Sequence, residues 1–367
     1  MKVVILHDWL TGFRGGERVL EALCQMYPDA PIYTLLHKKG STSPLIESKE
    51  IHTSFLDKIP GIYTHYRKFL PIMPLAVELM RIKQDADLVI SSSHCVIKGV
   101  KKPKGSKHIC YIHSPMRYIY DQFDNYFENK NLFIRASAYL ARPFLKLWDK
   151  KSNSNVDLFL PNSNFVQKRV QQHYELGSNV VYPFVELEDF KDVKKQAITK
   201  EDFYLMVTAF APNKRVDLAI DAFNELGLPL KIIGDGPEQT IQFFRSKAKE
   251  NIEFLGNLER KDVIDHLSRA KGFIFPGVED FGISPLEALA CGTPVIALKV
   301  GGALETLNEE VAVFFQEQTK ESLINAIKSM KLDNFDQHKL IQRANFFSKD
   351  KFILNLQSKI KQVVSAS

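Results

Sequence analysis

Short apolar runs alternate with longer stretches of helical periodicity along most of the chain. Apolar runs bounded by turn residues are typical of buried strands, and apolar residues three or four positions apart are typical of amphipathic helices. In the first half, strands are predicted at 3–7, 31–36, 88–93, 109–113, 158–161 and 180–182, and helices at 17–27 and 132–151. In the second half, strands are predicted at 203–208, 230–233, 252–255, 273–275, 295–298 and 311–315, and helices at 216–226, 237–249, 260–270, 285–290 and 320–330. This alternation predicts an α/β protein with parallel sheets covered by helices on both faces.

The pattern changes between residues 183 and 200, where Glu, Asp, Lys and Gln replace the apolar anchors. We interpret this stretch as a domain linker. A chain of 367 residues is long enough for two domains that each have a core. We therefore predict an N-terminal domain at 1–183 and a C-terminal domain at 184–347. An amphipathic helix at 349–364, within the terminal segment 348–367, completes the pattern.

Composition and charge narrow the class of protein. Hydrophobic residues make up 45% and charged residues 25% of the chain, as in ordinary soluble globular proteins. The first ten residues, MKVVILHDWL, hold too short an apolar run for a signal peptide or a membrane span. The four cysteines form no C-x-x-C pair, which favours reduced thiols and a cytoplasmic protein. Peripheral contact with the inner face of the cytoplasmic membrane is a second hypothesis for location.

The net charge of +6 is partly concentrated in one loop-like segment that holds no acid. Its cations are Lys98, Lys101, Lys102, Lys104 and Lys107. A solvated loop is the default interpretation, and contact with an anionic membrane or an anionic acceptor is the functional one. Nucleic acid is disfavoured as a partner, because no recognised binding motif accompanies the charge.

The stretch PGVEDFGISPLEALACGTPVIAL, residues 276–298, carries the strongest chemical signal. Glu279 and Glu287 lie eight residues apart around a Phe281-Gly282 turn. Ser284 is predicted to be an N-cap that begins a helix, and a glycine loop before a helix start presents backbone N–H groups to phosphates. The two carboxylates are placed to hold hydroxyls beside such phosphates, which suggests a nucleotide sugar. The alternative is structural: Ser284 and Glu287 also form a capping box, and Glu279 alone would be a solvated loop acid.

Four further stretches follow predicted strands, two of them in the first half. Gly15 and Gly16 lie in a glycine loop after the first strand. Such a loop either lets backbone N–H groups approach a phosphate or is only a tight turn. His113 ends a strand at the edge where open α/β sheets hold ligands, although a hydrogen-bonded core histidine is the default. For Arg117, four residues after His113, the two interpretations are that it binds an anionic acceptor group or that it caps a helix.

The other two candidate stretches lie in the second half. Lys214 and Arg215 are two cations before a helix, a placement that the helix dipole disfavours unless an anion binds there. Asp235 lies in a Gly-Asp-Gly-Pro turn whose structural explanation, a helix start with proline, is adequate alone. The D-x-D at Asp85 and Asp87 is interpreted as a structural turn. No His, Cys and Asp group has metal-ligand spacing, so we expect neither metal nor cofactor.

These motifs, from HDWLTGFRGGERVLEAL through HSPMRY, PNSNFV and PNKRVDLAI to the E-x7-E run, resemble those of retaining family 4 glycosyltransferases. The segment PNKRVDLAI resembles the corresponding segment in a bacterial mannosyltransferase subgroup of surface polysaccharide synthesis. The resemblance implies the GT-B fold: two Rossmann-like, doubly wound domains facing a deep interdomain cleft, with the last helix packing on the N-terminal domain. It also implies an N-terminal acceptor domain and a C-terminal nucleotide-sugar donor domain.

The resemblance assigns roles to the candidate residues. His113 and Glu279 would contact the transferred sugar, and Glu287 the ribose. The donor diphosphate would be bound by Gly15, Gly16, Lys214, Arg215 and the loop Phe281, Gly282 and Ile283, with Asp235 near the base. Ala209 stands where many members have an arginine, so Arg215 is expected to compensate. Arg117 is the candidate for the acceptor.

The expected activity is retaining, metal-independent transfer of a hexose, with mannose from GDP-mannose as first choice, onto a saccharide or lipid-linked saccharide acceptor. A UDP-sugar donor, or a non-catalytic subunit of a polysaccharide assembly complex, are the alternatives. An epimerase is disfavoured by the E-x7-E run, and an oxidoreductase by the missing G-x-G-x-x-G pattern.

Overall fold

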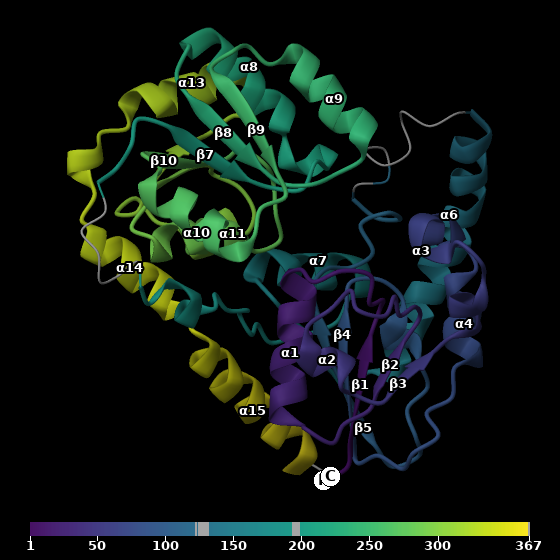
Figure 1. Ribbon diagram of the computed structural model, residues 1–367. Helices are drawn as coiled ribbons and strands as arrows, with labels where there is room; N and C mark the ends of the chain where they lie inside the picture. Colours follow the sequence, from purple (N-terminus) through teal and green to yellow (C-terminus); the bar gives the residue numbers. More distant parts are fainter. Residues whose placement is uncertain (122, 124–131, 193–198, 366–367) are drawn as a thin grey trace. The chain divides into compact units, whose positions relative to one another are not determined.

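The computed structural model describes residues 1–121, 123, 132–192 and 199–365. The chain divides into two compact units, one of Met1–Pro183 with Phe352–Ser367 and the other of Phe184–Lys351 (Figure 1). No helix among the described residues combines the length and the apolar composition that a membrane span requires.

The first unit is built on a parallel sheet with strand order β3-β2-β1-β4-β5-β6. Its strands are β1 (Val3–His7), β2 (Ile32–Thr34), β3 (Ile51–Thr53), β4 (Leu88–Ser93), β5 (Lys107–Ile112) and β6 (Leu158–Pro161). Its helices are α1 (Gly15–Met26), α2 (Pro44–Glu47), α3 (Ile62–His65), α4 (Met73–Leu79), α6 (Leu132–Ser152), α7 (Asn164–Tyr174) and most of α15 (Lys349–Ser365). The strand order reverses between β1 and β4, and ligands of open α/β sheets bind at the carboxyl ends of strands beside such a point.

The register of the central strands brings polar residues to one edge. His7 at the end of β1 pairs with Ser92 of β4, and Ser93 pairs with Ile112, the last residue of β5. Because the strands are parallel, their carboxyl ends finish at one level. The residue that follows β5 is His113.

The second unit repeats the arrangement with strand order β12-β11-β10-β7-β8-β9. Its strands are β7 (Tyr204–Val207), β8 (Leu230–Ile233), β9 (Ile252–Gly256), β10 (Gly272–Phe275), β11 (Val295–Leu298) and β12 (Ala312–Phe315). Its helices are α8 (Val216–Leu226), α9 (Glu238–Lys247), α10 (Arg260–Arg269), α11 (Ile283–Ala290), α12 (Ala303–Thr306), α13 (Lys320–Ser329) and α14 (Gln337–Phe346). Here the order reverses between β7 and β10. The predicted pair of doubly wound Rossmann-like domains is confirmed.

Several local predictions are wrong. Residues 180–182 form no strand, although the Val181 N–H donates to the Pro161 carbonyl, so the backbone follows β6 without a full ladder. Strand β3 was not predicted, because its short IHT segment has little apolar pattern. Helix α11 is capped by Gly282 in the left-handed region, with φ of 92°, and not by Ser284, which lies inside the helix.

One lysine of the predicted lysine loop, Lys98, is buried rather than solvated. Lys98 is 1% exposed, and its ammonium is 2.8 Å from Asp149 Oδ1. It also donates to Ser152 Oγ and Asn153 Oδ1, at 2.8 and 2.7 Å. Burying a lysine is tolerable only when its charge is paired and its protons are bonded, and both conditions hold. Lys98 is therefore a structural residue.

Candidate active site

The predicted site residues of the first unit meet at the carboxyl edge of its sheet. His113 Nε2 lies 2.8 Å from Ser92 Oγ, a hydrogen-bond distance, and the His113 N–H donates to the Ser93 carbonyl at 2.8 Å. A Cβ atom on Gly16 would lie 3.8 Å from both His113 Nε2 and His7 Cε1. Gly16 and His113, which are far apart in the sequence, thus lie next to each other at the carboxyl edge of the sheet.

Gly15 and Gly16 form the first turn of α1 rather than a loop before it. The first N–H groups of a helix have no partner within the helix and carry its positive partial charge. Glu17 Oε2 accepts one N–H bond, from Arg14, at 2.9 Å. The small residues keep the helix start open beside His113, which is the arrangement that anion binding at helix N-termini requires.

Two further histidines complete this edge and were not predicted as site residues. The His7 and His94 rings are 6.2 Å apart, and the His94 and His113 rings 6.4 Å apart. His7 is fully buried, and neither of its ring nitrogens has a hydrogen-bond partner; its Nε2 is 3.8 Å from Glu17 Oε1. Polar residues at the ends of buried strands are the sequence signal that identifies this cluster.

Asp8 holds the loop that carries His94. Its carboxylate is fully buried and accepts four backbone N–H bonds of 2.6 to 2.9 Å, from residues 94 to 97. A buried carboxylate needs such donors to replace its hydration. The bonds fix the His94 backbone next to β1, so Asp8 is a positioning residue for the edge of the sheet.

Burial, together with the nearby His94 and His7, lowers the pKa of His113 to about 3. Burial also lowers the pKa of His94, and the Arg117 cation contributes to that shift. His113 is therefore uncharged at neutral pH. Arg117 lies in a turn after His113, where its Nε donates to Ser114 Oγ at 3.4 Å. The structure thus places Arg117 beside the histidine cluster.

In the second unit, Lys214 and Glu279 form an ion pair, with each side chain about one-fifth exposed. Lys214 ends a 3-10 turn after β7, and Glu279 lies in the loop after β10. The Val278 N–H donates to the Asn213 carbonyl at 3.2 Å, which fixes the two loops together. These loops follow the two strands at which the sheet order reverses, so the pair occupies the expected ligand position.

The loop from Glu279 to Gly282 is held by close backbone packing. The Gly302 N–H donates to the Glu279 carbonyl at 2.9 Å. A Cβ atom on Gly302 would lie 2.3 Å from the Phe281 Cα atom, so no larger residue fits. Phe281 is 3% exposed and anchors the turn, and Gly282 then starts α11. The N-terminus of α11, at Gly282 and Ile283, thereby lies in the same short loop as Glu279.

Arg215 and Asp235 each form a hydrogen bond with a residue close to them in the sequence. Arg215 has a left-handed backbone, with φ of 52°, and its guanidinium bonds Asp217 at 2.9 to 3.1 Å. Its charge is therefore partly balanced by that carboxylate. Asp235 is exposed in the turn after β8, where its carboxylate accepts the Gly236 N–H at 2.7 Å.

Glu287 is a buried carboxylate with a specific cation. Its Oε1 lies 2.8 Å from Arg260 Nη1, and Arg260 Nε lies 2.9 Å from Asp189 Oδ2. Since Gly282 rather than Ser284 is the N-cap, the predicted capping box with Ser284 does not form. Arg260 holds Glu287 in a fixed orientation, and sequence reasoning missed it because the two residues are on different helices.

Other features of the described residues do not add to this site. No described residues form a cluster of three or more His, Cys, Asp or Glu side chains that could hold a metal.

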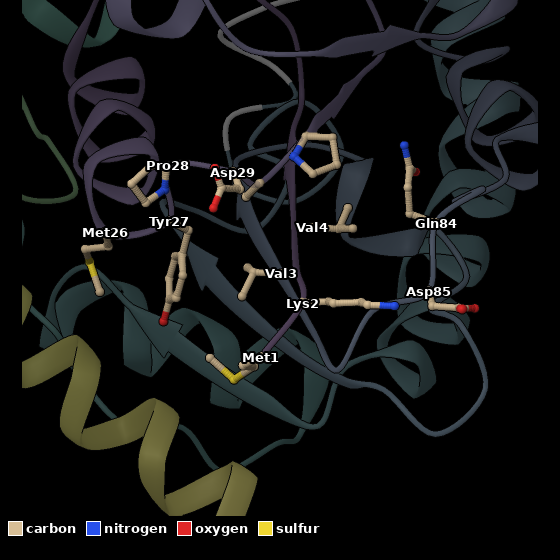
Figure 2. Close-up of a pocket in the computed structure, with 12 residues that line it drawn as sticks. Met1, Lys2, Val3, Val4, Met26, Tyr27, Pro28, Asp29, Gln84 and Asp85 are labelled. Atoms are coloured by element: carbon tan, nitrogen blue, oxygen red, sulfur yellow. The ribbon is translucent and has the colours of Figure 1, made fainter.

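A pocket of about 400 Å³ lies at the opposite, amino end of β1, lined by Met1–Val4, residues 26–31, Gln84 and Asp85 (Figure 2). It contains none of the predicted site residues. Asp87 nearby accepts the Lys2 N–H at 2.7 Å, which gives the D-x-D stretch a structural role.

Comparisons with known proteins agree with this geometry. Residues 188–346 match the glycosyl transferases group 1 family. The chain is 29% identical over 159 residues to an uncharacterized glycosyltransferase of Methanocaldococcus jannaschii, covering 42% of this chain and 43% of that protein. It is 26% identical over 290 residues to the alpha-1,3/1,6-mannosyltransferase ALG2 of Dictyostelium discoideum, covering 65% and 69%. The chain thus spans less than half of the archaeal relative and about two thirds of the other.

Solved structures extend the likeness to the whole chain. The sucrose-phosphate synthase of Thermosynechococcus elongatus superposes with a TM-score of 0.75 at 18% identity, covering 100% of both chains. At this identity the likeness concerns the fold, and it includes both units. The resemblance to glycosyltransferases that the motifs predict is confirmed: the chain has the two-domain GT-B fold, and its residues 188–346 match the glycosyl transferases group 1 model.

Proposed function

We propose that this protein is a retaining glycosyltransferase that transfers mannose from GDP-mannose to a saccharide or lipid-linked saccharide acceptor in cell-surface polysaccharide synthesis. The observation that carries the proposal is the Lys214–Glu279 pair at the strand-order reversal of the second unit, directly before the N-terminus of α11. It combines a cation and helix N–H groups for phosphates with a carboxylate for sugar hydroxyls. The segment lies within the matched glycosyltransferase domain.

In this proposal the second unit binds the donor and the first unit the acceptor. Lys214, Arg215 and the amides of Gly282 and Ile283 stabilise the departing diphosphate. By analogy with oxyanion holes, each such donor contributes about 2–4 kcal/mol to transition-state stabilisation. The transfer needs no metal in this scheme, because protein cations and helix N–H groups balance the leaving charge. Glu287, held by Arg260, binds the ribose, and Glu279 the hexose hydroxyls.

His113 supports the sugar as its glycosidic bond breaks. With a pKa of about 3, His113 is uncharged at neutral pH and does not repel the positive charge that develops on the sugar ring. The acceptor hydroxyl attacks from the side that the diphosphate leaves and gives its proton to the departing phosphate oxygen, which retains the anomeric configuration without an enzyme nucleophile. Arg117 binds an anionic group of the acceptor. The mannosyl donor is supported by the name of the Dictyostelium relative and by the resemblance of the PNKRVDLAI motif.

The first experiment measures thermal unfolding of the purified protein with GDP, UDP, ADP or no nucleotide. A ligand at about 100 times its Kd stabilises the folded state by roughly 2.7 kcal/mol. We expect a shift with GDP alone. A shift with UDP alone would replace mannose by a UDP-sugar and keep the class, and no shift with any nucleotide would favour a non-catalytic subunit.

A further inference from the structure

Helix α6 presents an apolar face to solvent. Leu140, Phe144 and Leu147 are 81%, 61% and 70% exposed. They are four and three residues apart, so they lie on one side of the helix. Large apolar side chains that gather on an exposed face mark an interaction site more often than scattered ones do.

A second apolar face lies on the neighbouring α4 segment. Ile72, Leu75 and Leu79 are 44%, 52% and 59% exposed and share one side of that helix. The two helices are linked, because Trp148 Nε1 of α6 donates to Glu78 Oε1 of α4 at 3.2 Å. We call the six residues on both helices the α4–α6 surface.

The opposite side of α6 is firmly anchored, which fixes the apolar side outward. Leu145 is 3% exposed in the core of the first unit, and Asp149 is fully buried in its ion pair with Lys98. Turning Leu140 and Phe144 inward would expose that ion pair and bury the α6 lysines. The apolar face is therefore a property of the folded unit.

The charges around the α4–α6 surface are mostly positive. Among the described residues of α6, the one acid is the buried Asp149, and the cations are Arg135, Arg142, Lys146, Lys150 and Lys151. Lys150 is paired with the exposed Glu175 at 3.2 Å. The exposed Arg67 and Lys68 lie in a 3-10 turn before α4, and the exposed Arg81 follows α4. Glu78 of α4 is paired with Lys101 at 3.0 Å. Apolar side chains bordered by cations are complementary to an anionic lipid surface.

We propose that the α4–α6 surface binds the anionic surface of a lipid bilayer. Its leucines and Phe144 enter the boundary between head groups and acyl chains, and the bordering lysines and arginines contact lipid phosphates. A second copy of this chain is a poorer occupant, because two such faces would bring their cations together. The inference concerns a surface apart from the candidate active site and does not rest on the proposed function.

The test is co-sedimentation of the purified protein with vesicles of phosphatidylcholine and phosphatidylglycerol, or of phosphatidylcholine alone. We expect binding to the anionic vesicles that weakens as salt is raised. Leu140→Ser/Phe144→Ser/Leu147→Ser should lower the partition at least about tenfold, because it removes the inserted side chains. Leu354→Ser on α15, where the leucine is 64% exposed, is the matched control and should bind like the parent.

A second variant, Lys150→Glu/Lys151→Glu, tests the charge contribution independently, and circular dichroism melts check that each variant folds. The proposal is overturned if the parent ignores anionic vesicles, binds neutral ones equally well, or loses no binding in the triple variant. It is also overturned if light scattering finds a parent dimer that the triple variant abolishes. The assay uses neither donor nor acceptor, so its outcome is separate from that of the nucleotide experiment.

Discussion

At the scale of single residues, three of the predicted donor-binding side chains are held by a partner of opposite charge. Lys214 is paired with Glu279, Glu287 with Arg260, and Arg215 with Asp217. Such pairs fix side chains before a ligand arrives, so less conformational entropy is lost on binding. In the Lys214–Glu279 pair, removing one member also leaves the other partly buried without that partner.

Lys214→Ala is predicted to lower the transfer rate by about 10²- to 10³-fold, because it removes a cation from the leaving diphosphate. The measurement is kcat and kcat/KM for mannosyl transfer, with donor hydrolysis as a second readout. Lys320→Ala removes a lysine from a surface pair with Glu225 and should leave the rate unchanged. Full activity of the Lys214 variant would refute the diphosphate role.

At the scale of elements, the start of α1 places Gly16 against His113 rather than in a free loop. An alanine methyl at position 16 would lie 3.8 Å from the nearest ring atom, which is ordinary contact and causes no clash. Substitution here therefore separates folding from binding.

Gly16→Ala should leave stability unchanged or raise it by up to about 1 kcal/mol, because alanine loses less backbone entropy in a helix. The added methyl occupies space beside His113, and we expect transfer to fall roughly tenfold to hundredfold. Thermal unfolding and transfer kinetics measure the two effects. Gly12→Ala lies nearby but away from His113, with Arg14 Nε at 3.9 Å, and should change neither. Equal activity of both variants would contradict the assignment.

At the scale of the molecule, buried histidines make stability depend on pH. His108 is fully buried between Ser91 Oγ at 2.9 Å and the Asn155 carbonyl at 3.0 Å, and burial lowers its pKa to about 4. In the unfolded chain a histidine takes up a proton near pH 6.5. Between about pH 6.5 and 4 the unfolded state binds more protons than the folded state, so the free energy of unfolding falls as pH falls.

For His108 alone, the predicted loss is about 2 kcal/mol between pH 7 and pH 5. His113 acts in the same direction, with its pKa of about 3. Urea unfolding at several pH values measures the slope. His108→Gln should flatten that slope whatever its effect at pH 7, and His338→Gln, at an exposed position, should not. A slope unaffected by His108→Gln would show that other groups cause the acid sensitivity.

The sequence by itself determined the architecture and the neighbourhood of the site. The alternation of apolar runs and amphipathic stretches predicts two parallel α/β sheets, because parallel strands are buried on both faces and need helical crossovers. Since such sheets hold ligands at the carboxyl ends of strands, the positions of His113, Lys214 and Glu279 after strands made them candidate site residues.

Only the tertiary structure decided which charges meet and which side chains are buried. The Lys214–Glu279 and Glu287–Arg260 pairs, the Asp8 bonds to residues 94–97 and the burial of Lys98 all join residues far apart in the chain. Local pattern reports the period and polarity of a segment, whereas partners depend on strand order and loop packing. For the same reason the apolar face of α6 looks like a core face in sequence, and only the anchoring of its other side at Leu145 and Asp149 turns it to solvent.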